Sequence, residues 1–145
     1  MAITTSVICN SFKKELLEGT HNFKASGGNS FKLALYTNSA TLGKSTTSFT
    51  TDNQVSNTGQ YTSGGGALTN GGTSLSTNTA IIDFADRSFT GVTLTARGAL
   101  IYNDTASGDP AVAVLDFGGD KSASSGTFTI QFPAFTASAA ILRIT

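Results

Sequence analysis

The sequence predicts a mainly β fold: an antiparallel β-sandwich or barrel-like domain with one short N-terminal α-helix. One segment near the N-terminus repeats its apolar residues with a helical period. From residue 31 onward, apolar residues either form short runs or occur at every second position, and clusters of Gly, Asn, Ser and Asp separate these segments. We expect a single domain over residues 1–145, with an arm and helix over about 1–19 and a Gly/Ser/Thr/Asn-rich excursion over about 38–78.

The predicted helix spans about residues 7–18. Its apolar residues recur at four-residue spacing and fall on one face, whereas lysine and glutamate side chains occupy the other face. The apolar positions are Ile8, Phe12 and Leu16. Ser6 is the predicted N-cap and Gly19 the predicted C-terminal stop.

The strands are predicted from the two-residue period and from short apolar runs. Residues 31–36 alternate as a half-buried strand does, and residues 111–115 form a continuous apolar run, which is typical of a central strand buried on both faces. The alternation of Phe128, Ile130 and Phe132 indicates a strand with one buried face. The full set of expected strands is 31–36, 80–84, 89–95, 99–102, 111–117, 127–132 and 140–144, with turns over 103–110 and 118–126.

The segment over residues 38–78 contains too few apolar residues to bury much surface by itself. It is predicted to be either a long surface excursion or a pair of weakly patterned strands ordered by contacts with the rest of the domain. The isolated apolar residues are Leu42, Phe49, Val55, Tyr61, Leu68 and Leu75.

Composition limits the classes of partner. Nine basic and nine acidic residues give a formal net charge of zero, and charged residues make up only 12% of the chain. Ser and Thr together number 40, so hydroxyl groups supply most of the polarity. Nucleic-acid binding and binding to anionic membranes need a basic surplus, so we expect neither partner. A surface with so little charge favours self-association. The N-terminal residues show no export signal, which predicts synthesis in a cytoplasm.

The chain offers little for catalysis or metal binding. His21 is the only histidine, and we interpret it as a hydrogen-bonded turn residue, whereas Cys9 is interpreted as a small buried hydrophobe. One Cys and one His rule out the usual zinc sites within one chain, and the aspartates lack the spacing of a calcium loop. The Gly64-Gly65-Gly66 run lacks the lysine that follows in a phosphate-binding loop. We therefore expect no enzyme activity, no cofactor and no metal.

Arg97 stands in an otherwise uncharged stretch and has two interpretations. Its guanidinium is either an anchor for a carboxylate of another subunit, which it would bind through two hydrogen bonds, or a solvated group on a strand face.

Five blocks of the sequence resemble a group of small virion structural proteins of tailed bacteriophages. They are residues 12–19 (FKKELLEG, with His21 and Phe23 after it), 31–36 (FKLALY), 96–103 (ARGALIYN), 112–121 (VAVLDFGGDK) and 128–133 (FTIQFP). The resemblance implies a non-enzymatic particle component, of which a decoration or cement protein on the capsid head is the first expectation. The partners implied are the major capsid protein and other copies of the chain, as a trimer or local cluster, and the implied location is the head surface of the virion.

Two surface segments are the expected contacts with the capsid, because exposed and adaptable backbone often carries binding. They are the N-terminal residues Ala2, Ile3, Thr4, Thr5 and Ser6, and the glycine-rich residues Tyr61, Gly64, Gly65 and Gly66, with Arg97 as a possible intersubunit contact. The alternative is a tail- or fibre-associated protein, or an adhesin that stacks tyrosine rings on host-surface sugars. The chain has no tryptophan and only three tyrosines for such a site.

Overall fold

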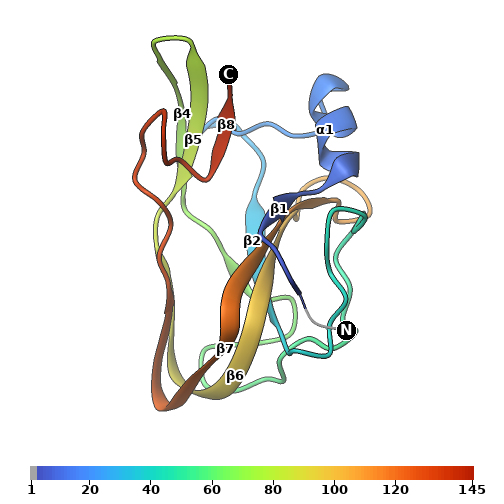
Figure 1. Ribbon diagram of the computed structural model, residues 1–145, viewed down its shortest axis with the longest axis vertical. Helices are drawn as coiled ribbons and strands as arrows, with labels where there is room; N and C mark the ends of the chain where they lie inside the picture. The colour runs from blue at the N-terminus through green and yellow to red at the C-terminus, as the bar shows by residue number, and fades with distance from the viewer. Residues whose placement is uncertain (1–2) are drawn as a thin grey trace.

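In the computed structural model, which describes residues 3–145, the chain forms two antiparallel sheets and one short helix near the N-terminus, so the predicted fold class is confirmed (Figure 1). The larger sheet has the strand order β1-β7-β6-β2-β3 and the smaller sheet the order β4-β5-β8. The elements are β1 (Val7–Ile8), α1 (Asn10–Leu17), β2 (Phe31–Tyr36), β3 (Gly66–Ala67), β4 (Asn70–Ser76), β5 (Thr79–Phe84), β6 (Arg87–Asn103), β7 (Ala111–Ile130) and β8 (Leu142–Ile144).

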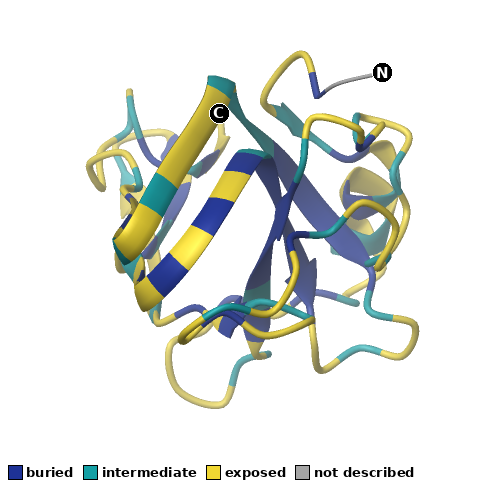
Figure 2. Ribbon diagram, turned by 90° about the horizontal axis from the view of Figure 1, so that it is seen from below, coloured by how far each residue is buried: buried dark blue, intermediate teal, exposed yellow. Residues whose placement is uncertain are grey.

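The most buried part of the chain is the centre of the larger sheet. There β2 pairs with residues 98–103 of β6, and residues 98–102 of β6 pair in turn with residues 111–116 of β7. All four residues from 111 to 114 are buried, as predicted for a strand covered on both faces. Figure 2 shows buried positions running through these strands and exposed loops around them.

β6 and β7 correct the prediction of four short strands with a turn over 118–126. They are continuous strands of 17 and 20 residues, and residues 118–126 belong to β7. The pair shifts register at four points, and Gly91, Gly118 and Ser125 have positive φ. Such bulges absorb turn-forming residues and bend the ribbon without ending it. Figure 1 shows the bent ribbon curling from the larger sheet toward the side where β5 and β8 lie.

The predicted helix over 7–18 is too long at its start. Val7 and Ile8 pair with Val114 and Ala113 of β7, and the helix begins only at Asn10 with Cys9 at the N-cap position. The Ser6 hydroxyl accepts a hydrogen bond from the Asp116 amide instead of capping the helix. Two apolar residues before a helix are compatible with either a helical turn or a strand. The edge of β7 supplies backbone hydrogen-bonding groups, so here they form a strand. The predicted stop at Gly19 is confirmed by its φ of +77°.

The middle segment combines the two structures that the sequence left open. Residues 38–65 form a surface excursion, whereas β3 and β4 are short strands. The excursion is ordered by the few apolar residues it contains: Val55 and Tyr61 are buried, and the ring of Phe49 stacks on Tyr102 at a centroid distance of 4.6 Å.

The smaller sheet and α1 lie on opposite sides of one end of the molecule, the upper end in Figure 1. The strand predicted over 80–84 is confirmed as β5, but the one predicted over 140–144 is reduced to the three residues of β8. β8 pairs with β5, which places the C-terminal residues at the edge of this sheet.

Candidate functional site

His21 is buried and forms part of a hydrogen-bonded network, so its interpretation as a hydrogen-bonded residue is confirmed. Its Nε2 lies 3.1 Å from Oε1 of Glu15, and its Nδ1 lies 3.1 Å from Nδ2 of Asn103. Oδ1 of Asn103 accepts the amides of Thr105 and Ala106, so its Nδ2 faces the imidazole and donates to it. Nδ1 is therefore an acceptor, and Nε2 carries the proton that it donates to Glu15.

This arrangement uses the histidine to hold α1 against the larger sheet. Glu15 belongs to α1 and Asn103 ends β6, and the imidazole also lies against the ring of Phe12 at a centroid distance of 4.8 Å. The spacing along the chain gave no sign of these partners. Both ring nitrogens are engaged by them.

Cys9 is fully buried, as predicted. Burial raises the pKa of the Cys9 thiol to about 11, and the nearby Glu15 carboxylate adds to this effect. The thiol therefore stays protonated at neutral pH and does not provide a thiolate nucleophile. Across residues 3–145, no three His, Cys, Asp or Glu side chains gather in a group that could hold a metal ion.

The predicted contact residues of the N-terminal arm divide into two kinds. Ala2 lies outside the described residues. Ile3 is fully buried, so the prediction that it is available for contact is wrong, whereas Thr4, Thr5 and Ser6 are exposed. The arm is an anchored segment, because Ile3 fits where Gly98 leaves room: its Cδ1 lies 2.6 Å from the position that a Cβ on Gly98 would occupy.

Arg97 supports the same anchor, and its interpretation as a solvated group on a strand face is wrong. Its Nε donates to the Ile3 carbonyl at 3.1 Å, and its Nη2 lies 3.3 Å from Oδ1 of Asp116. The side chain is mostly buried. The carboxylate that Arg97 binds thus belongs to its own chain, and the pair fixes the arm to β6 and β7.

The glycine-rich contact residues are also structural. Tyr61 is fully buried, and its hydroxyl accepts from the Leu35 amide at 2.7 Å and donates to Oε1 of Gln54 at 3.0 Å. Gly65 has a φ of +80°, and a Cβ there would lie 1.8 Å from the Leu33 carbonyl oxygen. The Gly64 carbonyl accepts a hydrogen bond from the Tyr102 hydroxyl at 2.6 Å, and Gly66 is buried. The prediction that Tyr61 and Gly66 are exposed for contact is therefore wrong, whereas Gly64 and Gly65 are half-buried.

The same burial removes the predicted sugar-stacking site. Tyr36, Tyr61 and Tyr102 are all buried, and burial raises the pKa of each phenol. None of the three rings presents a face for a sugar.

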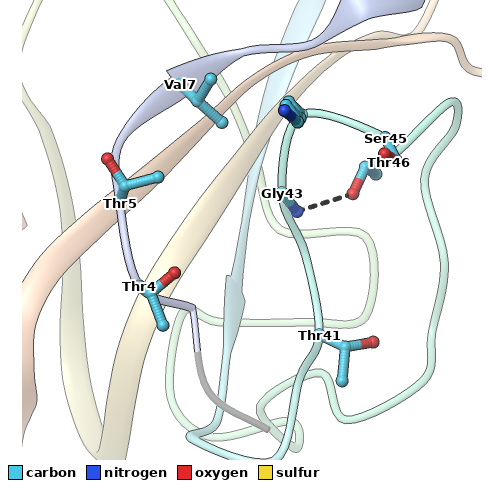
Figure 3. Close-up of a pocket in the computed structure, with 8 residues that line it drawn as sticks. Thr4, Thr5, Val7, Thr41, Gly43, Ser45 and Thr46 are labelled. Carbon is cyan, nitrogen blue, oxygen red and sulfur yellow. Dashed lines mark hydrogen bonds between the residues drawn. The ribbon is translucent and has the colours of Figure 1, made fainter.

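The exposed part of the arm forms one wall of a hydroxyl-lined cleft of about 520 Å³. Figure 3 shows Thr4, Thr5 and Val7 on one side and Thr41, Gly43, Ser45 and Thr46 on the other. A hydrogen bond within the loop stabilises the second wall: the Gly43 amide donates to the Thr46 hydroxyl at 3.0 Å. Lys44 is the single charged residue of the lining. Five of the eight lining residues carry hydroxyl groups, which can donate and accept hydrogen bonds with a polar partner surface.

A second hollow, an apolar groove of about 170 Å³, separates α1 from the smaller sheet. Its walls are Ile8, Phe12, Leu16 and Phe23 on one side and Thr73, Ala80, Ile81, Ile82, Leu142, Arg143 and Ile144 on the other. The apolar pattern of the sequence did not predict this groove. Two features of the sequence could have indicated it: the isolated Leu75 among hydroxyl residues, and the apolar residue Ile144.

The chain matches no protein-family model, no curated protein and no solved structure in the comparisons made. Within the described part of the chain, no helix is both long and apolar enough to cross a membrane.

Proposed function

We propose that this protein is a non-enzymatic structural component of a bacteriophage virion, a decoration protein that binds the outside of the head and stabilises the capsid lattice. The sequence blocks that resemble phage virion proteins support the proposal. They lie mostly on α1, β2, β6 and β7, the elements that make the core of the domain. The resemblance therefore concerns the scaffold of the domain.

The concentration of exposed apolar side chains at one end supports a role in assembly with other protein chains. The large apolar side chains that are exposed in residues 3–145 are Leu17, Leu75, Phe135 and Ile144. Ile144 lines the groove, Leu75 pairs across the sheet with the groove residue Ala80, and Leu17 follows the groove residue Leu16 in α1. Clustered apolar side chains around a groove mark a surface that binds protein.

The hydroxyl-lined cleft is the surface that we assign to the capsid. Its lining includes Thr4 and Thr5 of the predicted contact arm, and the arm is held in place through Ile3 and Arg97. Hydroxyl-rich surfaces with little charge suit a contact repeated many times on a lattice, because neighbouring copies do not repel each other. Many copies that bind only the assembled lattice stabilise it by mass action.

Aspartate at position 5 tests this assignment. Thr5→Asp places a carboxylate in the cleft, where it would lose hydration on contact, so we expect lower occupancy on particles. Ser56→Asp is the matched control, because Ser56 is an exposed hydroxyl residue on another loop. Purified protein is mixed with phage heads that lack it, and bound protein is measured after sedimentation. Equal binding of the two variants and the unaltered protein would contradict the cleft assignment, and no binding of the unaltered protein would contradict the decoration role.

A further inference from the structure

We propose that the apolar groove is a self-association surface, and that its occupant is the Leu75 side chain of a second copy of this chain. The inference goes beyond the proposed function, because it concerns free protein in solution and a different surface from the hydroxyl-lined cleft.

The register of the smaller sheet puts the groove and a projecting side chain on the same face. Thr73, Ile82 and Leu142 align across the three strands, and Leu75, Ala80 and Ile144 form the next row. Residues two apart in a strand share a face, so both rows point the same way. All of these residues except Leu75 line the groove, and Leu75 is 71% exposed beside them, while Ile144 is 58% exposed.

The groove has the size of one apolar side chain. Its volume of about 170 Å³ is close to that of an engineered cavity of roughly 150 Å³ that binds benzene. A leucine side chain is of similar bulk, and the lining opposite the sheet is entirely apolar. A projecting leucine and a receiving groove on one face make that face complementary to itself, which is the condition for a two-fold contact.

The charges on this face do not oppose a second copy. The rows that would meet contain no ionisable side chain. Arg143 is the single charged residue of the lining, and its Nη1 donates to the Ala137 carbonyl at 3.2 Å. On α1, Lys14 and Glu18 form an ion pair at 3.1 Å. A neutral face matches a copy of itself better than it matches a strongly charged partner.

The available area predicts a weak dimer. β4 and β5 have 7 and 6 residues, so at about 3.3 Å per residue and about 4.8 Å between strands the sheet face measures roughly 20 Å by 14 Å. One side of the 8-residue helix α1 adds about 12 Å by 10 Å, so the two elements together measure roughly 400 Å² per copy. Ile82, Phe84 and Leu142 on this sheet face are already buried within the chain, so a pair buries less than about 800 Å². Stable interfaces bury roughly 1,200–2,000 Å², so we expect a dissociation constant on the order of 100 µM.

Sedimentation velocity of the full chain between about 1 µM and 1 mM tests the inference. The expected result is a concentration-dependent dimer whose dissociation constant rises at least about tenfold in Leu75→Ser. Folding should be unaffected because Leu75 is largely exposed, and the circular dichroism spectrum checks this. Phe135→Ser is the matched control: Phe135 is 39% exposed and does not line the groove, so its dimer should be unchanged.

A protein that stays monomeric over the whole range would overturn the inference, and so would a dimer that Leu75→Ser leaves intact or that both variants weaken equally. These outcomes are separable from failure of the proposed function. Loss of particle binding with an intact dimer contradicts the decoration role alone, whereas particle binding by a strict monomer contradicts self-association alone.

Discussion

Replacing Ile3 with alanine tests whether the N-terminal arm is an anchored part of the fold. The Ile3 side chain is fully buried, and its carbonyl accepts the Arg97 guanidinium at 3.1 Å. Truncating a buried isoleucine to alanine costs about 2–5 kcal/mol, through lost burial and the cavity left behind. Neighbouring side chains can partly fill the space left by the truncated side chain, so we expect a loss of about 3 kcal/mol in the free energy of unfolding. For a domain of this size, this corresponds to a fall in Tm of about 6–12 °C.

The assay is urea unfolding followed by tyrosine fluorescence, with Thr4→Ala as the control. Thr4 is the exposed neighbour of Ile3 on the same arm, and exposed substitutions usually change stability by less than about 0.5 kcal/mol. If Ile3→Ala and Thr4→Ala unfold at the same urea concentration, the arm does not contribute to the core and the role given to Arg97 is also wrong.

Three further changes test other buried features. Tyr61→Phe leaves the Leu35 amide without its acceptor, so urea unfolding should show a loss of about 2 kcal/mol, and a loss below about 0.5 kcal/mol would contradict the hydrogen bond. Gly65→Ala should cost more stability than Gly108→Ala, because both glycines have φ near +80° but only Gly65 lies against backbone; equal losses would contradict this contact. Burial raises the pKa of Tyr61 to about 12, so the unfolded chain releases the phenol proton near pH 10 while the folded chain keeps it. The contribution of Tyr61 to the free energy of unfolding should therefore be constant below about pH 10 and fall by about 3 kcal/mol between about pH 10 and 12. An unchanged urea midpoint over that range would contradict the raised pKa of Tyr61.

The fold class followed from the sequence because periodicity reports which faces are buried. The apolar run over 111–115 appears as the start of β7, which is buried except for the half-buried Leu115. Residues 31–36 form the predicted strand β2, but the prediction that it is half-buried is wrong, because every residue except Lys32 is buried. The continuity of β6 and β7 did not follow, because Gly118 to Gly126 has the composition of a turn. A strand partner that supplies ladder hydrogen bonds, together with bulges, overrides that local preference.

The candidate sites were much harder to predict. Arg97 and Asp116 were visible as charged residues, but their pairing joins two strands, and the carbonyl of Ile3 joins them from a third segment. The glycine and hydroxyl residues around Tyr61 predict an exposed side chain. Its burial depends on the hydroxyl satisfying the Leu35 amide, a contact between residues 26 positions apart. The groove depends on β8 pairing with β5, which no local pattern determines.

The central claim, that the protein is a decoration protein of a phage head, is tested most directly by quantitative mass spectrometry of virions purified from any phage whose genome contains this sequence. The measured quantity is the number of copies relative to the major capsid protein. The decoration role predicts a copy number equal to that of the capsid subunit or a simple fraction of it. A few copies per particle would contradict a head decoration role and indicate the tail or a vertex, and absence from virions would contradict the structural role altogether.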